Sequence, residues 1–146
     1  MNHFLQKNYN EIHQNYRRSA VCQFDLGGNF DRSILCVWSE CDKFPYKTPP
    51  HFHVISETSS VCIKLNTSEY YLDGKNKDFL TESQMRLLNE KLKELNMNNP
   101  HTKMEERLTH WELLCDFWNG GENTRQSIRL IQPDYSTIKI PEKEGV

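Results

Sequence analysis

The spacing of apolar residues divides the chain into a β-rich middle and a helical second half. Between residues 20 and 72 the apolar residues come in short runs separated by turn signals such as Gly27-Gly28-Asn29. Short runs of this kind are typical of strands and hairpins. Strands are expected at residues 20–26, 33–38, 51–55, 60–65 and 69–72, and a further short one at 127–131. After residue 80 the apolar period changes from two to 3.6, which predicts helices.

The first predicted helix covers residues 82 to 96. Thr81 and Gln84 have the spacing of a capping box, and Leu80 precedes the cap as a hydrophobic staple does. The apolar stripe of this helix is Met85, Leu88, Leu92 and Leu95. The run Asn96–Pro100 then ends the helix.

The second predicted helix begins after a cap at Thr102 and ends before Gly120-Gly121. Its stripe is Met104, Leu108, Trp111, Cys115 and Trp118. The last turns are apolar nearly all round, because they also carry Leu113, Leu114 and Phe117. We therefore expect this end to be buried by the sheet, by the first helix or by another chain.

Together these elements predict one α+β domain over residues 1–146. The expected architecture is a mostly antiparallel sheet of about five strands, with the two C-terminal helices packed on one face. Residues 1–20 are a candidate N-terminal helix, and residues 133–146 form a polar tail.

Composition narrows the classes of function. Lys and Arg number 18 and Asp and Glu number 20, a net charge of −2, which excludes a polybasic grip on nucleic acid as the main activity. No run approaches the roughly 18 apolar residues that cross a bilayer, and the polar first residues lack the apolar core of a secretion signal. Five cysteines without a Cys-x-x-Cys pair indicate reduced structural thiols. We expect a cytoplasmic protein without a membrane partner.

The least generic stretch is Pro49-Pro50-His51-Phe52-His53-Val54. Residues two apart on a strand share a face, so His51 and His53 are expected to point the same way. Two neighbouring imidazoles can divide acid and base roles in phosphodiester cleavage, or bind a transition metal. The alternative is two histidines on a solvated strand face. Spacing alone favours this alternative, because a metal site needs at least a third protein ligand.

Glu57 is the candidate third ligand. The spacing His51-x-His53-(three residues)-Glu57 resembles part of the first cupin motif, whose histidines and glutamate hold a metal inside a β-barrel. The flanking glycines and the second cupin motif have no counterpart in this chain. We therefore predict that the protein has no cofactor. The alternative is a divalent transition metal bound by His51, His53 and Glu57.

Residues 34–118 resemble the bacterial domain-of-unknown-function family numbered 4160. The matching parts are Ile34–Trp38, Pro49–Val54, Ser60–Leu65, the helix around Met85–Leu95, and Glu112–Trp118 with its late tryptophan. The resemblance implies a small bacterial protein encoded beside a second small protein, in an arrangement like a toxin–antitoxin module. Family members tend to carry a further histidine ahead of the prolines, where this chain has Tyr46-Lys47-Thr48.

Two functions of different classes follow, and a cupin-like metal-binding protein is a third alternative. The first is a non-enzymatic interaction module of such a two-component system, whose partner is a small protein encoded nearby. Its contact surface is an exposed sheet edge or the apolar end of the second helix, with Trp111, Leu114, Phe117 and Trp118. The alternative is a ribonuclease-like toxin or metal-dependent enzyme that uses His51 and His53 as acid and base or as ligands.

Single-stranded RNA is a further candidate partner. Aromatic residues and lysines are interleaved in the middle of the chain and could form a stacking surface, although such mixtures are common on ordinary sheets. The residues concerned are Lys43, Tyr46, Lys47, Phe52, Lys64, Tyr70 and Tyr71. The sequence does not predict the oligomeric state.

Overall fold

The computed structural model describes residues 20–37, 49–72, 78–120 and 131–140 of the 146-residue chain. Apart from Ala20 and Ile131, the predicted helix over residues 1–20 and the predicted strand at 127–131 lie outside these ranges.

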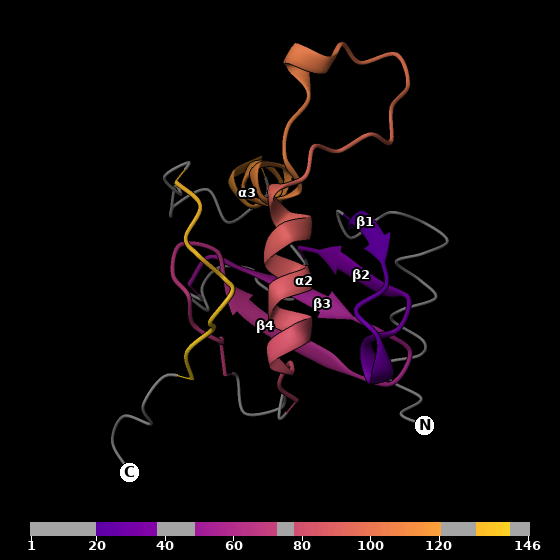
Figure 1. Cartoon of the computed structure of the whole chain (residues 1–146). Helices are drawn as coiled ribbons and strands as arrows, with labels where there is room; N and C mark the ends of the chain where they lie inside the picture. Colours follow the sequence, from indigo (N-terminus) through magenta and orange to yellow (C-terminus); the bar gives the residue numbers. More distant parts are fainter. Residues whose placement is uncertain (1–19, 38–48, 73–77, 121–130, 141–146) are drawn as a thin grey trace.

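Four strands form one antiparallel sheet with the order β1-β2-β3-β4 (Figure 1). The strands are β1 (Ala20–Phe24), β2 (Ser33–Cys36), β3 (His51–Ile55) and β4 (Ser60–Lys64). Each strand pairs with the next along the chain, so the predicted meander and the α+β class are confirmed. About five strands were expected, whereas the described part of the sheet has four. The segment predicted as a strand at 69–72 instead makes isolated bridges, Ile63 with Tyr70 and Glu69 with Lys139.

The connection between β1 and β2 contains the predicted glycine turn. Gly27 has φ 83° and Gly28 has φ 58°, left-handed values that glycine adopts without a steric penalty. The Asp25 carboxylate accepts a hydrogen bond of 2.7 Å from the Gly27 N–H. A single turn of 3-10 helix, η1 (Gly28–Phe30), then leads into β2.

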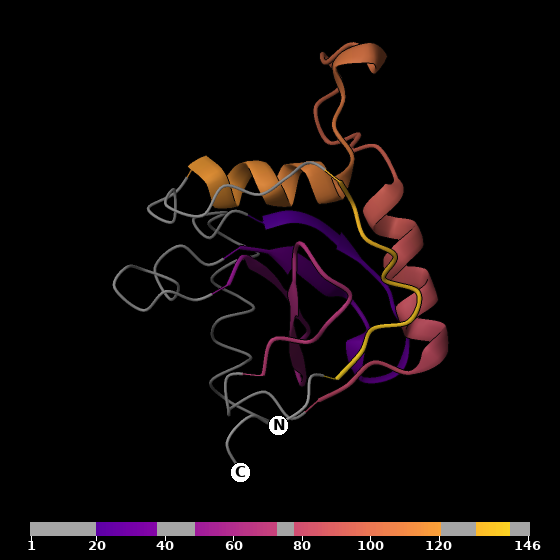
Figure 2. The ribbon, with the colours of Figure 1, turned by 90° about the vertical axis from the view of Figure 1, so that its left-hand side faces the viewer.

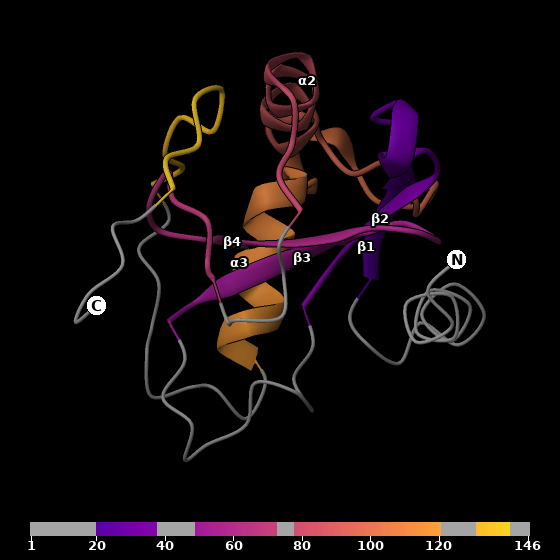
Figure 3. The same ribbon diagram turned by 90° about the horizontal axis from the view of Figure 1, so that it is seen from below.

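The first predicted helix is confirmed as α2 (Glu82–Lys93), which ends three residues earlier than expected. Its capping box is complete. Thr81 Oγ1 accepts from the Gln84 N–H at 3.2 Å, and Gln84 Oε1 accepts from the Thr81 N–H at 2.9 Å. Leu88 and Leu92 of the predicted stripe are buried, and α2 lies along one face of the sheet (Figures 1 and 3).

The second helix, α3 (His110–Gly120), begins later than the sequence pattern predicts. Its cap is Thr109 and not Thr102. Thr109 Oγ1 accepts from the Glu112 N–H at 3.1 Å, and a Glu112 carboxylate oxygen accepts from the Thr109 N–H at 2.9 Å. Thr102 has the same spacing to Glu105, so this spacing alone does not set the helix start. The reciprocal bonds form at Thr109 and Glu112.

The residues before Thr109 form an excursion with one short turn, η2 (Met104–Glu106). Met104 and Leu108, which were expected on the buried stripe, are exposed. Helix α3 itself runs crosswise to α2 (Figure 2). The packing of both helices on one face stays a prediction. Within the described ranges, neither helix is long and apolar enough to cross a membrane.

The main core lies where α2, α3 and residues 131–140 meet the sheet. Its large buried side chains include Phe30, Leu35, Phe52, Ile63, Leu65, Leu88, Leu92, Trp111, Trp118 and Tyr135. The Trp111 indole N–H donates to the Leu65 carbonyl at 3.1 Å and to the Tyr135 hydroxyl at 3.0 Å. Burial raises the pKa of the Tyr135 hydroxyl, which therefore stays protonated at neutral pH. These bonds tie helix, sheet and C-terminal segment together.

Candidate functional site

The two motif histidines lie on the same face of β3. Their ring centroids are 5.1 Å apart in an edge-to-face arrangement. Phe52 and Val54, which alternate with them, belong to the main core. The alternation predicted from the sequence is therefore confirmed. The histidine face is not solvated, however, because His51 is only 1% exposed and His53 only 6%.

His51 is held by its own double-proline lead-in. Its Nδ1 lies 2.7 Å from the Pro49 carbonyl oxygen. A carbonyl can only accept, so Nδ1 carries the hydrogen and, in the neutral ring, Nε2 is the basic nitrogen. The ring stacks on Tyr71 at 4.6 Å and lies 5.4 Å from the Trp118 ring on α3. The imidazole thus joins the sheet to α3.

His53 pairs with a cysteine on the next strand. Cys62 stands opposite His53 in the β3–β4 register, and its Sγ lies 3.0 Å from His53 Nδ1. On the other side, Cys36 of β2 is the register partner of His53. Both cysteines are buried. We call His51, His53, Cys62, Tyr71 and Trp118 the histidine cluster.

Sequence reasoning missed Cys62 because two facts were needed at once. The alternation in Ser60–Leu65 shows which residues share a face, but only the strand register shows which of them meets His53. The sequence pattern alone therefore does not predict the contact between Cys62 Sγ and His53 Nδ1.

The predicted metal ligands are not all brought together. Glu57 is half-buried in the turn that follows Ile55, which the Ser56 N–H closes by donating to the Ser59 carbonyl at 2.8 Å. That turn lies beyond the end of the strand that carries His51 and His53. Among the residues that the structure describes, no group of three or more histidines, cysteines and carboxylates is placed to hold a metal ion.

The predicted partner surface on α3 needs correction. Trp111, Leu114 and Trp118 are buried in the main core, and only Phe117 is partly exposed. The end of α3 is apolar nearly all round, and other parts of the same chain cover it. These side chains support the fold and do not form an open surface for a partner.

Two other cysteines, Cys22 and Cys115, have thiols of low reactivity. Burial raises the pKa of Cys22 to about 12, and burial together with Glu112 and Asp116 raises the pKa of Cys115 to about 12. Neither thiol forms an appreciable amount of thiolate at neutral pH. They behave as small hydrophobic residues.

A second feature is the segment between the two helices, residues 96–108, which we call the arm. Its far end stands clear of the sheet and both helices, while its base contacts β1 (Figures 1 and 2). Its ends are joined, because the Asn96 N–H donates to the Leu108 carbonyl at 2.8 Å and Leu95 bridges to Thr109. The arm is therefore a closed loop on a paired base.

Arg107 braces the arm from inside. Its guanidinium donates to the Asn96 carbonyl at 2.9 Å and to the Asn99 carbonyl at 2.7 Å. The side-chain amides of Asn96 and Asn98 donate to the Val21 carbonyl on β1, at 3.2 and 3.1 Å. These bonds tie the base of the arm to β1.

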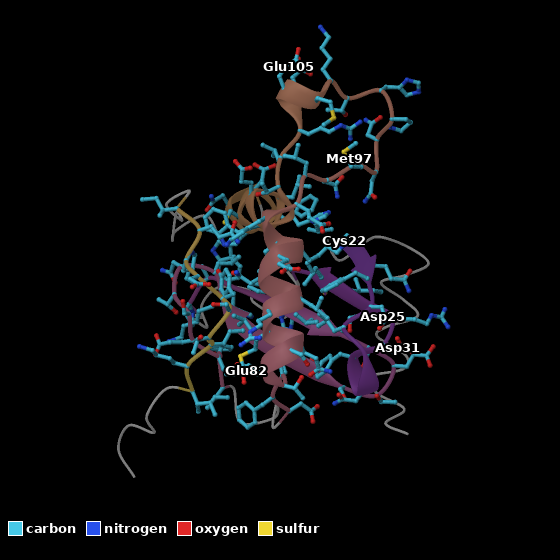
Figure 4. The ribbon with its side chains drawn as sticks, viewed as in Figure 1. Cys22, Asp25, Asp31, Glu82, Met97 and Glu105 are labelled. Carbon is cyan, nitrogen blue, oxygen red and sulfur yellow. The ribbon has the colours of Figure 1, made fainter. Side chains whose placement is uncertain are left out.

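The arm presents apolar side chains to solvent. Met97 and Met104 are each 56% exposed, and Leu108 is exposed as well. In Figure 4, Glu105 stands at the tip of the arm and Met97 lies nearer to the body. Sequence reasoning had taken this stretch for a helix start, and so missed it as a surface.

Comparisons of this chain with protein-family models, with curated proteins and with solved structures found no match.

Proposed function

We propose that this chain is a protein-interaction module of the bacterial cytoplasm, one half of a two-component system of the toxin–antitoxin type. Its partner is the small protein encoded nearby, and the arm is the contact element. The observation that carries the proposal is the exposure of Met97 and Met104 on a braced loop that stands away from the body.

Order in the arm favours binding. A loop held by Arg107 loses little conformational freedom when a partner docks, so more of the contact free energy appears as affinity. Methionine side chains are flexible and polarizable, which lets them fit an apolar surface of irregular shape. Exposed methionines are a common feature of binding surfaces for this reason.

Charge on the arm favours a protein over RNA. Lys103 and Arg107 balance Glu105 and Glu106, so the arm has no formal excess of either sign. Binding through phosphates requires a surplus of cations, which the arm does not offer. An apolar contact with mixed charges at its edge matches the composition of protein–protein interfaces.

The test is co-expression with the product of the adjacent reading frame, followed by affinity capture and titration of the purified pair. The double substitution Met97→Asp with Met104→Asp places charge on the contact, and we expect affinity to fall at least about a hundredfold. The matched control, Met97→Leu with Met104→Leu, keeps an apolar surface and should bind within about threefold of wild type.

Both variants should melt at the wild-type temperature, because the side chains are exposed. Equal affinity of the aspartate and leucine variants would exclude the arm as the contact. If the wild-type chain does not bind the product of the adjacent reading frame, the proposal as a whole is excluded.

A histidine-dependent ribonuclease is the second candidate, favoured by one observation. Two imidazoles at 5.1 Å, one of them 3.0 Å from a thiol, form a set of groups capable of acid–base catalysis. Their burial requires a local opening before RNA can enter. Cleavage of single-stranded RNA by the wild type, lost in a folded His51→Gln variant, would support this function. Intact RNA after prolonged incubation would exclude it.

A further inference from the structure

The Cys62–His53 pair is capable of redox chemistry, which neither proposed function uses. A sulfur and an imidazole nitrogen at 3.0 Å are at hydrogen-bond distance, with both groups more than nine-tenths buried. A nucleophile beside a base at this distance is the recurrent signature of an activated side chain. We propose that Cys62 is a modification site, a thiol activated by His53 toward small uncharged oxidants such as hydrogen peroxide.

The geometry sets Cys62 apart from Cys22 and Cys115. Cys22 and Cys115 have pKa values raised to about 12 by burial, and no imidazole compensates that cost. Cys22 is nevertheless the more exposed thiol, since Cys62 is fully buried. Accessibility alone would therefore make Cys22 react first, whereas activation by His53 makes Cys62 react first.

The reaction is a two-electron oxidation of sulfur. Nδ1 of His53 accepts the thiol proton while Sγ attacks one oxygen of hydrogen peroxide, forming an S–O bond as the O–O bond breaks. The hydroxide that leaves takes the proton back from Nδ1 and departs as water. Cys62 becomes a sulfenic acid and the peroxide is reduced.

The burial of Cys62 limits which reagents can reach its thiol. Cys62 and His53 are reached only through local openings of the sheet, which admit small molecules more readily than large or charged ones. Hydrogen peroxide and small neutral alkylating agents meet this requirement. Peptide disulfides such as oxidised glutathione do not.

Cys36 and Cys62 lie too far apart across the sheet to form a disulfide with each other. Cys36 and Cys62 pair with His53 from opposite sides, so β3 lies between them. Two strand spacings amount to about 9.6 Å, beyond the roughly 7 Å between Cα atoms that a disulfide spans. Dimedone that is present during the oxidation captures the sulfenic acid as it forms.

The experiment uses the full chain with Cys41→Ser, because Cys41 lies outside the described residues. The protein is treated with a small excess of hydrogen peroxide and dimedone, and the extent of labelling at each cysteine is measured by peptide mass spectrometry over time. At pH 7 we expect Cys62 to be labelled at least about tenfold faster than Cys22 and Cys115.

The His53→Gln variant keeps a polar side chain without a base, and should lower the Cys62 rate to that of Cys115. If this variant does not fold, the comparison among the cysteines of the wild-type chain decides. Labelling of Cys62 no faster than Cys115, or faster labelling of Cys22, would overturn the proposal. The same holds if His53→Gln folds and leaves the Cys62 rate unchanged.

Discussion

The histidine cluster and the arm differ in what they offer to another molecule. The cluster gathers two imidazoles, a thiol and two large aromatic rings, and its histidines are at most 6% exposed. The arm has no comparable grouping of reactive side chains, and half or more of its two methionine side chains meets solvent. Reactive groups and open surface are thus placed in separate parts of the molecule.

This separation changes how the Pro-Pro-His-Phe-His-Val motif is interpreted. An unusual motif suggests a working site, yet here the His51 ring fills the space between Tyr71 and Trp118. The arm has no recognisable motif, but it has the access that binding requires. A motif search alone would direct mutagenesis to the part of the chain where folding and function are hardest to separate.

The largest expected effect is at Trp118. Replacing this buried side chain with alanine removes a large part of the contact between α3 and the sheet, and we expect a loss of about 3–5 kcal/mol in the free energy of unfolding. Urea denaturation followed by circular dichroism measures it. Phe117→Ala, at the partly exposed position beside it, should cost markedly less. Equal small losses at both positions would mean that α3 is not anchored as described.

His51 comes next. His51→Ala removes the hydrogen bond to Pro49 and the stacking on Tyr71, and we expect a loss of about 2–3 kcal/mol. His101→Ala on the arm is the matched control, because that side chain is exposed and should change stability by less than about 0.5 kcal/mol. A His51 variant as stable as wild type would indicate that this histidine is kept for chemistry and not for packing.

The two threonines before α3 allow a direct comparison, with a smaller expected loss in the free energy of unfolding. Thr109→Ala removes a cap that holds the Glu112 N–H, which should lower the free energy of unfolding by about 1 kcal/mol. Thr102→Ala removes no helix cap, and we expect no measurable change. Both are measured by urea denaturation. The reverse order of effects would place the start of α3 where the sequence pattern had put it.

The smallest effect on overall stability is expected for Arg107→Ala. Loss of the two bonds to Asn96 and Asn99 should loosen the arm while leaving the body intact. Hydrogen exchange of the arm amides should become faster, and exchange within β2 and β3 should not change. Faster exchange throughout the chain would show that the arm and the body form one cooperative unit.

The sequence was sufficient to predict a structural feature where that feature depends on residues close together in the chain. The capping box of α2, the glycine turn after β1 and the shared face of His51 and His53 each depend on residues a few positions apart. It was insufficient where a result depends on contacts between distant segments. The Cys62–His53 pair needs the strand register, and the burial of Trp111 and Trp118 needs the path of the whole chain.

The start of α3 shows a third kind of difficulty. Thr102 and Thr109 both precede a run with helical spacing, and periodicity from Met104 onward favoured the first. Both threonines have a glutamate three residues on, Glu105 and Glu112, and the structure shows the reciprocal bonds at Thr109 and Glu112. Periodicity alone therefore extended the helix over residues that form the arm.

The bonds from Trp111 to Leu65 and Tyr135 also bear on the order in which the molecule is made. During synthesis, the indole N–H and the Leu65 carbonyl leave the ribosome before the phenol that shares their bonding. The interior can close completely only after residue 135 has emerged. Until then the contact between Trp111 and Leu65 lacks the phenol of Tyr135 that completes it.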